Sequence, residues 1–392
     1  MAVNFDRLRS YFRSLPETEN VPACELVVTK DHETVFHETA GCRDSAGKVP
    51  ASEDDWYWMY SCTKVMTVTA VMQLIEQGKI RLYDPVSRFL PEYECMRVYD
   101  NDYRHLMGVG AGLPPEDAPV HYAKNPIRII DLMAMMGGLS YQMHTKAIDA
   151  LVAESGGEAS TREVIRALAE SPLFYEPGED FAYSMCHDVL AAVVEEVSGE
   201  RFSTYMQEHV FAPAGAADLT FLPGEKEKER ISALYADAPD GTRNTVTADG
   251  LAITKNYESG GGGLCGTIGS YSRVLEALAC GGTVRGGGRI LEEESVRRFC
   301  TGVTTGIAQK HFELMEKGPY SYGLGVRVKR LAYIGKSPVG EFGWDGAAGA
   351  YALVDLKNHV SIAYAEHILG HQGIYTRIHP MLRDLAYEGL GL

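Results

Sequence analysis

Ser61 and Lys64 have the residue types and the spacing that most directly suggest chemistry in this chain. They stand three positions apart at the start of an apolar segment, 65–77, that stops at Gly78. In a helix, residues i and i+3 share a face, so the lysine amine can take a proton from the serine hydroxyl. The free amides and partial positive charge of a helix start favour an alkoxide and an oxyanion. The spacing therefore predicts a serine nucleophile paired with a lysine base.

A second copy of the same S-x-x-K pattern, Ser45 to Lys48, provides an internal comparison. It lies in a polar, glycine-containing stretch that is typical of a loop and enforces no geometry. Ser61 instead follows an aromatic run of strand character, 56–60, and precedes a segment that is apolar on almost all sides and is therefore expected to be buried. A buried helix holds a nucleophile rigidly. The simpler alternative is that Ser61 only caps the helix.

A serine–lysine pair also needs a second proton carrier and donors for the oxyanion, and two further segments offer them. Tyr183 precedes the apolar stretch 187–197, which predicts a helix. The pKa of a phenol beside a lysine ammonium is expected to fall, so that Tyr183 can carry a proton between Ser61 and a leaving group. Packing is the alternative for a tyrosine in a chain that contains 22 of them. The stretch 342–351 predicts a strand whose small residues let a substrate or another backbone approach closely.

Net charge and hydropathy limit the class of partner. The chain has 392 residues and a formal net charge of −16. Nucleic acids and anionic membrane surfaces both require basic patches, so this charge argues against both as partners. No stretch approaches the ~20 apolar residues of a membrane span. A small, neutral or cationic molecule is the partner that the composition favours, and the oligomeric state is left open.

The cysteines indicate a cellular compartment. Eight cysteines are scattered along the chain without a C-x-x-C pair or a metal-binding spacing. Free thiols fit a reducing environment, and residues 1–15 mix charged and apolar side chains in the manner of an amphipathic surface helix, without the apolar core of a signal peptide. We therefore expect a cytoplasmic protein, unless an export signal has been trimmed away.

The order of elements predicts an α/β (α+β) fold in which an antiparallel sheet flanked by helices is built from both termini. A hairpin is expected at 25–29 and 34–38, and strands return near the end of the chain. Those strands are expected at 320–329, 340–354 and 360–365, with a turn at 355–358. Helices are expected at 127–136, 161–170, 187–197, 202–210, 264–279, 292–298 and 374–387. Residues 1–83 and 235–392 then form one discontinuous domain, 84–234 form an inserted, mostly helical subdomain, and the nucleophile lies at the seam.

The order of these motifs resembles the serine β-lactamase-like superfamily, which includes class C β-lactamases and penicillin-binding proteins. Within it, the chain is most similar to the carboxylesterase branch of the family VIII type. The resemblance extends from about residue 24 to residue 387 and includes segments that carry no chemistry, namely 73–78, 84–92, 196–199, 259–264 and 322–325. It implies a β-lactamase/transpeptidase-like fold and acyl transfer through a serine.

The resemblance also implies roles for individual residues. Ser61 corresponds to the nucleophile, Lys64 to its paired base, and Tyr183 to the tyrosine of the family's Y-x-N motif. The backbone amides of Ser61 and Ala347 correspond to the oxyanion hole. No metal and no cofactor are implied.

Two positions depart from the lactamase pattern. Met185 replaces the asparagine of Y-x-N, and Trp344 replaces the lysine of K-T-G, of which only Gly346 matches. We therefore assign Met185, Trp344, Asp345 and Gly346 to substrate binding. The departures favour a carboxylesterase acting on small or short-chain esters. The alternatives are a β-lactamase, a D-Ala-D-Ala carboxypeptidase or D-aminopeptidase, an acyltransferase, and a penicillin-recognising sensor without turnover.

Two further patterns suggest ligands but have simpler explanations. Residues 261–266 satisfy G-x-G-x-x-G, yet they follow a polar stretch rather than the strand that a nucleotide-binding fingerprint requires. His367 and His371 lie four apart beside Glu366, but Gly370 interrupts the helix that would align them on a metal. We interpret them as a pocket-edge or a buried, hydrogen-bonded pair of histidines.

Trp56, Trp58 and Asp188 complete the candidates. The two tryptophans share one face of the expected strand, so they belong to the core, or line a pocket for the acyl group. Asp188 either orients the region around Tyr183 or is an acidic residue in the first turn of a helix.

Overall fold

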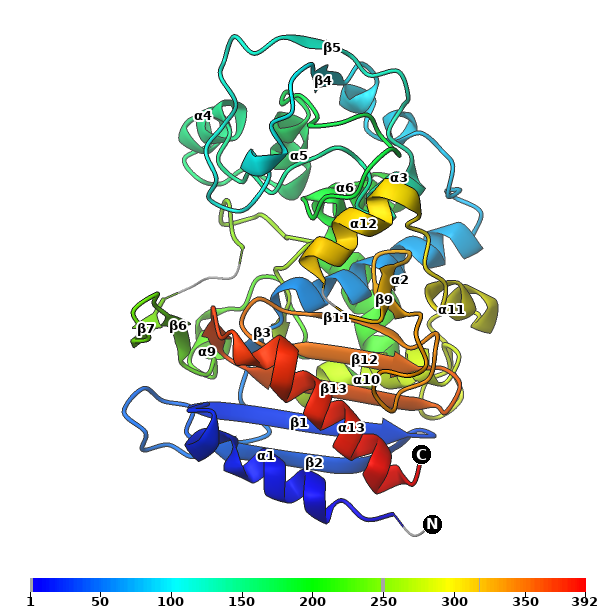
Figure 1. Cartoon of the computed structure of the whole chain (residues 1–392). Helices are drawn as coiled ribbons and strands as arrows, with labels where there is room; N and C mark the ends of the chain where they lie inside the picture. Colours follow the sequence, from blue (N-terminus) through cyan, green and yellow to red (C-terminus); the bar gives the residue numbers. More distant parts are fainter. Residues whose placement is uncertain (1–2, 248–250, 317) are drawn as a thin grey trace.

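The computed structural model describes residues 3–247, 251–316 and 318–392, and its centre is a seven-stranded antiparallel sheet (Figure 1). The strand order is β2-β1-β13-β12-β11-β10-β9. The N-terminal part contributes β1 (Ala23–Lys30) and β2 (Glu33–Gly41). The C-terminal part contributes β9 (Tyr320–Tyr322), β10 (Arg327–Lys329), β11 (Phe342–Asp345), β12 (Tyr351–Asp355) and β13 (Val360–Glu366). The prediction of an antiparallel sheet built from both termini is confirmed.

Helices cover both faces of this sheet. On one face lie α1 (Asp6–Thr18) and α13 (His379–Leu390), which bury a separate apolar cluster with β1, β12 and β13. Figure 1 shows these two terminal helices side by side on the same face. On the other face, α10 (Ile268–Ala279) packs across β1, β12 and β13. The result is a three-layered α–β–α arrangement, in which each helix covers an apolar face of the sheet.

The helix α2 (Thr63–Glu76) runs between the sheet and the helical part of the molecule. Every residue from Thr63 to Leu74 is buried, as expected for a helix that is apolar almost all round. It packs against α6 (Cys186–Ser198), and Gly78 follows its end with a φ of +69°, a left-handed conformation that glycine adopts without strain. The expected helix at 65–77 is confirmed with its stop signal.

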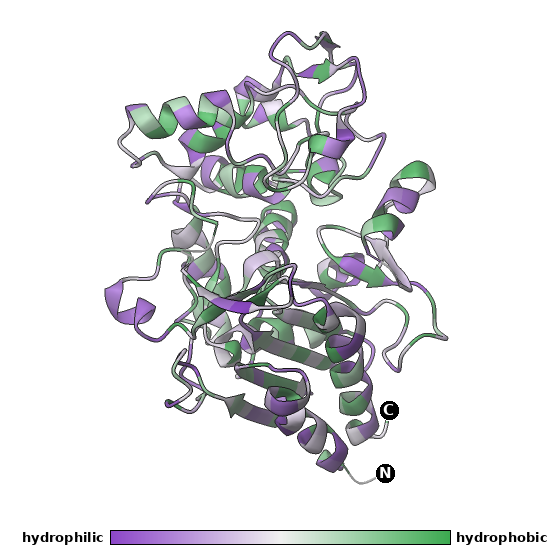
Figure 2. Cartoon of the chain, turned by 60° about the vertical axis from the view of Figure 1, so that its left-hand side comes forward, coloured by the Kyte–Doolittle hydropathy of each residue, from purple (hydrophilic) through white to green (hydrophobic). Residues whose placement is uncertain are grey.

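The chain between α2 and β6 (Leu234–Asp237) is mostly helical, and its part from β4 (Arg97–Tyr99) to α6 forms the upper part of Figure 1. Besides α6, it comprises α3 (Ile129–Met133), α4 (Lys146–Glu154), α5 (Thr161–Leu168), α7 (Phe202–Met206), the π-helical turn η5 (Gln207–Phe211), and a small ladder of β4 (Arg97–Tyr99) with β5 (Val120–Tyr122). A short ladder pairs β3 (Tyr57–Trp58), which precedes α2, with β8 (Cys265–Gly266), which precedes α10. Hydrophobic residues concentrate along the strands of the large sheet in Figure 2, and hydrophilic residues on outer helices and loops.

Short 3-10 turns, η2 (Val86–Arg88), η3 (Pro91–Tyr93) and η4 (Arg104–Leu106), follow α2, and further small elements lie elsewhere in the chain. They are α8 (Ala212–Ala214), α9 (Glu225–Lys228), α11 (Glu293–Phe299), α12 (Gly306–Met315), and a three-stranded sheet of β6 (Leu234–Asp237), β7 (Arg243–Val246) and β14 (Ile368–Leu369). Within the described ranges, no helix combines the length and the apolar character needed to cross a membrane.

Two expected strands are each divided in the structure. The segment 320–329 breaks into β9 and β10 around Gly325, whose φ is +83°. The segment 340–354 is not continuous, because residues 346–350 form a turn between β11 and β12. The expected helix at 264–279 begins only at Ile268, since residues 265–266 pair with β3 instead.

Candidate active site

Ser61 lies in a single 3-10 turn, η1 (Tyr60–Cys62), that leads directly into α2. The turn is entered through Tyr60, whose φ of +43° is unusual for an aromatic residue and marks local strain of the kind that gathers at functional sites. Lys64 Nζ lies 3.4 Å from Ser61 Oγ. The predicted contact of the two side chains across one turn is confirmed. Ser61 is 9% exposed to solvent, whereas Lys64 is completely buried.

The ammonium of Lys64 is enclosed by a carbonyl and two aromatic rings. Its Nζ donates to the carbonyl oxygen of Gly261 at 2.7 Å. It also lies 4.5 Å from the ring centre of Tyr183 and 5.5 Å from that of Tyr141. Burial lowers the pKa of Lys64 to about 7, although the carboxylate of Asp188 acts in the opposite direction. The amine is therefore neutral for a substantial fraction of the time near neutral pH.

Tyr183 stands between two other rings. It stacks on Trp344 with ring centres 5.6 Å apart and on Tyr141 at 5.5 Å. Trp344 Nε1 donates a hydrogen bond of 3.1 Å to the Tyr183 hydroxyl oxygen. Burial raises the pKa of Tyr183 above its ordinary value, although hydrogen bonds with Ser61 and Trp344 act in the opposite direction. The expected lowering of this pKa is wrong, because desolvation outweighs these two hydrogen bonds.

The turn 346–350 brings Ala347 to the nucleophile. Cys62 Sγ donates to the Trp344 carbonyl oxygen at 3.3 Å, and Gly346 lies so close to the Met59 carbonyl that a Cβ would overlap it. Ala347 is exposed, and its amide makes no hydrogen bond with a described residue. This amide is therefore available as a hydrogen-bond donor. The glycine at 346 is required by the close approach of two backbones.

Two residues assigned to substrate binding are placed elsewhere. Asp345 follows Trp344 on β11, and successive side chains of a strand point to opposite faces. Its carboxylate binds Arg327 and His379 behind the sheet, so it does not face Ser61. Met185 is 1% exposed and belongs to the main apolar core. The assignment of Asp345 as a substrate ligand is wrong for this reason, and Met185 offers no open surface to a substrate.

Asp188 fixes the glycine-rich loop that faces Lys64. It lies in the first turn of α6, as expected, and its Oδ1 accepts from Tyr257 (2.7 Å), Ser259 (2.6 Å) and the amide of Gly261 (3.3 Å). These bonds orient the Gly261 carbonyl toward the amine. Sequence reasoning did not find the contribution of this loop or of Tyr141; the serine at the head of a four-glycine run was the available signal.

Residues outside this group carry other polar clusters. His367 binds the Trp58 amide and the Ser232 carbonyl, and His371 binds Glu366, so the interpretation of both as buried, hydrogen-bonded histidines is confirmed. Trp56 and Trp58 are both buried in one cluster with Tyr60. Glu200, Glu208 and His209 offer possible metal ligands within 4.8 Å of one another, on a partly exposed surface.

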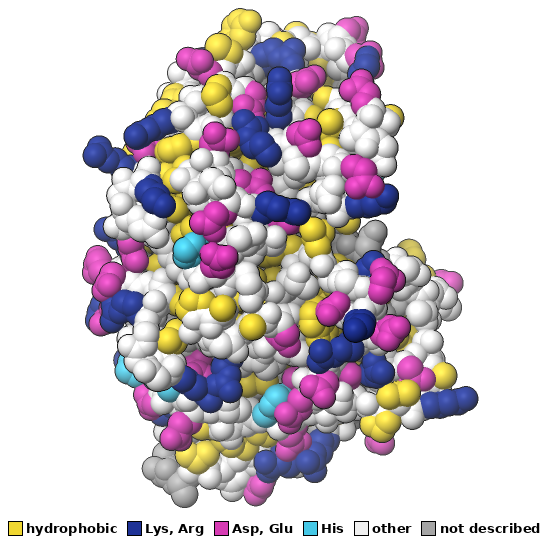
Figure 3. Space-filling model, turned by 180° about the vertical axis from the view of Figure 1, so that it is seen from behind, with side chains coloured by type: hydrophobic (Ala, Val, Ile, Leu, Met, Phe, Trp, Pro, Cys, Tyr) yellow, Lys and Arg dark blue, Asp and Glu magenta, His cyan; other side chains and the backbone are white. Residues whose placement is uncertain are grey.

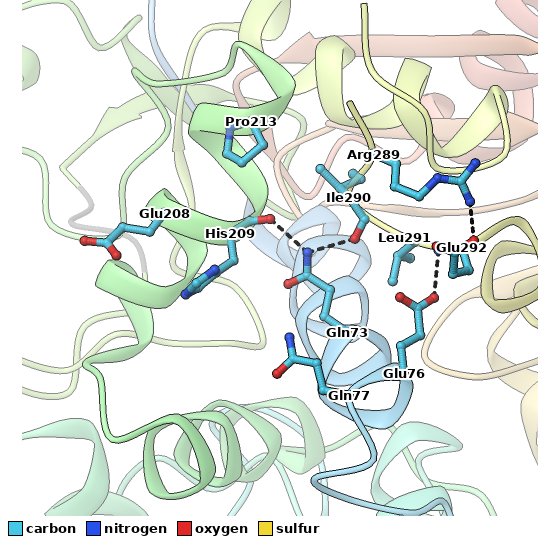
Figure 4. A pocket seen from close by; sticks show the side chains of 10 residues that line it. All are labelled: Gln73, Glu76, Gln77, Glu208, His209, Pro213, Arg289, Ile290, Leu291 and Glu292. Atoms are coloured by element: carbon cyan, nitrogen blue, oxygen red, sulfur yellow. Dashed lines mark hydrogen bonds and ion pairs between the residues drawn. The ribbon is translucent and has the colours of Figure 1, made fainter. Parts of the chain in front are cut away.

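A pocket of about 330 Å³ lies at the other end of α2 (Figure 4). Gln73 stands at its centre and donates to the carbonyls of His209 and Ile290, both at 2.8 Å. The pocket lies about 20 Å along the helix from Ser61. None of the described residues that line it belongs to the Ser61 group. On the face opposite to Figure 1, acidic and basic side chains are interspersed across the described surface (Figure 3).

Comparison with known proteins agrees with this geometry. A model of the Beta-lactamase family matches residues 8–373. Protein Rv1367c of Mycobacterium tuberculosis is 30% identical over 377 residues, which cover 92% of this chain and 90% of that protein. Esterase EstB of Burkholderia gladioli is 26% identical over 297 residues, 69% of each chain. The solved structure of EstCE1, described as a hydrolase with promiscuous acyltransferase activity, superposes with a TM-score of 0.76 at 21% identity and covers 97% of each chain.

The family match extends over nearly the whole chain, from α1 to the segment just before η6 (Ile374–Ile378). It therefore includes the strands of the large sheet and the mostly helical stretch between them, and the superposition with EstCE1 shows the same overall fold. The chain belongs to the Beta-lactamase family.

Proposed function

We propose that this protein is a serine hydrolase, and specifically a carboxylesterase that forms an acyl-enzyme on Ser61. The observation that carries the proposal is the fully buried amine of Lys64, 3.4 Å from Ser61 Oγ and with its pKa lowered to about 7. A general base is most effective when its pKa is close to the working pH. A lysine in an ordinary solvated setting would be protonated at neutral pH and could not accept the serine proton.

The lowered pKa of Lys64 and the raised pKa of Tyr183 support different roles for the two groups in proton transfer. Neutral Lys64 accepts the proton of Ser61, whose oxygen attacks the ester carbonyl. The amides of Ser61 and Ala347 bind the oxyanion. Tyr183, whose raised pKa keeps it protonated, donates its proton to the departing alkoxide and regains one from Lys64. Tyr183 then carries a proton toward the leaving group, as expected, but the proton of Ser61 reaches it through Lys64. Water then hydrolyses the acyl-enzyme by the reverse proton transfers.

The side chains around the nucleophile favour an uncharged ester over a β-lactam. Trp344, Tyr141 and Tyr183 present aromatic rings, and Trp344 stands where the lactamase pattern has a lysine. The carboxylate of a β-lactam would lack a cation there, because the side chain of Arg327, on β10, projects from the other face of the sheet and is paired with Asp345. Desolvating an unpaired carboxylate costs several kcal/mol. The relationship to an esterase supports the same substrate class.

An acyltransferase is the second candidate, because the same acyl-enzyme reacts with an alcohol or amine in place of water. EstCE1, which shares the fold, is described as a hydrolase with promiscuous acyltransferase activity. Formation of new ester products when an alcohol is added to the reaction would favour this candidate. A burst of product without steady-state turnover would instead favour a sensor.

A substrate screen tests the proposed function. The rates of hydrolysis of p-nitrophenyl esters of increasing chain length are compared with those of a chromogenic cephalosporin and a D-alanyl peptide. We expect the best short-chain ester to exceed both others in kcat/KM by ~10²-fold or more, the factor that corresponds to about 2.7 kcal/mol. A cephalosporin that is hydrolysed as fast as the best ester would contradict the esterase proposal and place β-lactamase activity first.

A further inference from the structure

Asp345 forms a charged network behind the strand that carries Trp344. Its Oδ2 accepts from Arg327 Nη1, and its Oδ1 lies 2.8 Å from His379 Nδ1. The side chains of Arg327 and His379 are each 3% exposed, and that of Asp345 is 15% exposed. The carboxylate is thus held by two partners on different elements, β10 and α13, on the far side of the sheet from Ser61.

Arg327 is itself held rigidly. Its guanidinium lies between two aromatic rings, 5.0 Å from the centre of Tyr320 and 5.3 Å from that of Tyr351. Its backbone pairs with Gly343, two residues before Asp345 on the neighbouring strand, so that the side chains of Arg327 and Asp345 project from the same face. A planar cation between two rings has little freedom to follow a displaced carboxylate.

His379 connects the carboxylate to the other end of the turn 346–350. Its Nδ1 faces Asp345, and its Nε2 lies 3.2 Å from the carbonyl oxygen of Gly349. The ring also stacks on Tyr351, with centres 4.5 Å apart. Whichever nitrogen carries the proton, the imidazole lies between Asp345, just before the turn, and Gly349, near its end.

Tyr375 binds the middle of the same turn. Its hydroxyl lies 2.9 Å from the Gly346 carbonyl oxygen and 3.2 Å from that of Ala347. The backbone of the turn is therefore tied at its start, middle and end by side chains that approach from behind or from the rim. Ala347, between these ties, is exposed, and its amide makes no hydrogen bond with a described residue.

We propose that Asp345, Arg327 and His379 form a positioning network that sets the place of the Ala347 amide, and that Asp345 acts through this backbone and not by touching substrate. A buried ion pair is a weak means of stabilising a fold, since well-packed apolar side chains often do as well. Its fixed directions do, however, specify one backbone arrangement. An oxyanion donor needs this specificity, because a displacement of about 1 Å costs ~10²-fold in rate.

The inference rests on the proposed acyl chemistry of Ser61. Its test is therefore designed to distinguish a failure of the positioning network from a failure of that chemistry. Asp345→Asn keeps the shape of the side chain and removes its charge. Glu92→Gln is the matched control, because Glu92 pairs with Arg162 in the helical segment, away from the turn. For each protein we would measure kcat and KM with a p-nitrophenyl ester, and the rate at which a fluorophosphonate labels Ser61. Circular dichroism verifies folding.

We expect Asp345→Asn to lower kcat and the labelling rate together by ~10²-fold, with KM changed by less than about threefold, since the oxyanion donor acts in the transition state. Glu92→Gln should leave both rates unchanged. A folded Asp345→Asn protein with normal kcat overturns the inference, and so does a raised KM with unchanged kcat, which would indicate a substrate contact. If the wild-type protein itself is not labelled, the proposed function fails instead.

Tyr375→Phe keeps the test decisive if Asp345→Asn does not fold. It removes only the hydroxyl that binds the Gly346 and Ala347 carbonyls. We expect a parallel loss of kcat and labelling rate of about fivefold, the scale of one neutral hydrogen bond. Unchanged kcat and labelling in this variant would overturn the claim that these ties set the place of the amide.

Discussion

The two faces of β11 carry neighbouring residues in opposite settings. On one face, Trp344 stacks on the uncharged ring of Tyr183. Burial there lowers the pKa of Lys64 to about 7 and raises that of Tyr183. On the other face, Asp345 is bound by a guanidinium and an imidazole. On the first face, the buried amine of Lys64 forms no ion pair with a carboxylate of the described residues, whereas on the second face Asp345 and Arg327 are paired. The contrast teaches that the reactive face depends on an amine without an ion-pair partner, while the ion pair on the opposite face holds the backbone of β11 in place.

The largest expected effect comes from removing the nucleophile on the reactive face. Ser61→Ala should lower kcat by ~10³-fold or more, since the covalent route is lost. Ser45→Ala, in the other S-x-x-K copy, lies in an exposed loop and should leave kcat unchanged. Steady-state hydrolysis of a p-nitrophenyl ester measures both. Comparable losses in the two variants would mean that Ser61 has no special role.

Lys64→Met should lower kcat by ~10²-fold or more, the usual cost of a lost general base. It should also change stability in a pH-dependent way. The folded-state pKa of Lys64, about 7, lies below its ordinary value of 10.5, so the penalty for burying the amine is fully present below about pH 7 and falls as the pH rises toward 10.5.

Unfolding in urea at several pH values measures this difference. The stability of Lys64→Met relative to the wild type should decrease by on the order of 1 kcal/mol per pH unit between about pH 7 and pH 10. A constant difference over that range would show that the pKa of the lysine is not lowered, whatever happens to activity.

Tyr183→Phe should lower kcat with alkyl esters by ~10²-fold, because it removes the proposed proton donor to the leaving group. A p-nitrophenolate departs without protonation, so the loss with a p-nitrophenyl ester should be clearly smaller. Tyr93→Phe serves as the control, since that hydroxyl binds the Ile165 carbonyl in the helical segment. Equal losses with both classes of ester would assign Tyr183 to the base and not to the acid.

Trp344→Phe should have the smallest effect. It keeps a ring to stack on Tyr183 and removes only the 3.1 Å hydrogen bond to the phenol oxygen. A loss of about fivefold in kcat is expected for one neutral hydrogen bond. Stopped-flow measurement of acylation isolates this step. A loss as large as that of Tyr183→Phe would show that the indole does more than support the phenol.

Local features of the site were predictable from sequence, and features that depend on tertiary contacts were not. The meeting of Ser61 and Lys64 depends only on helical spacing, and the end of α2 on Gly78. The raised pKa of Tyr183 depends on burial by Trp344 and Tyr141, which lie far away in sequence. The Gly261 carbonyl that binds Lys64 belongs to a loop nearly two hundred residues later.

The sheet shows the same division. The strands from both ends were predictable because their apolar patterns are local, but the turn 346–350 was not, since its small residues also suit a strand. Alternation along β11 was nevertheless sufficient to place Trp344 and Asp345 on opposite faces. Applying it would have excluded Asp345 as a substrate ligand.

The pH dependence of fluorophosphonate labelling at Ser61 tests the central claim most directly, that a neutral Lys64 activates this serine. The rate is followed by intact mass, and the modified peptide is identified after digestion. We predict one label per chain, on the peptide that contains Ser61, at a rate that rises with pH through a midpoint near the lowered pKa of Lys64, about 7. Labelling on another residue, or a rate at Ser61 that does not change between about pH 5 and pH 9, a range that spans this pKa, would contradict the account.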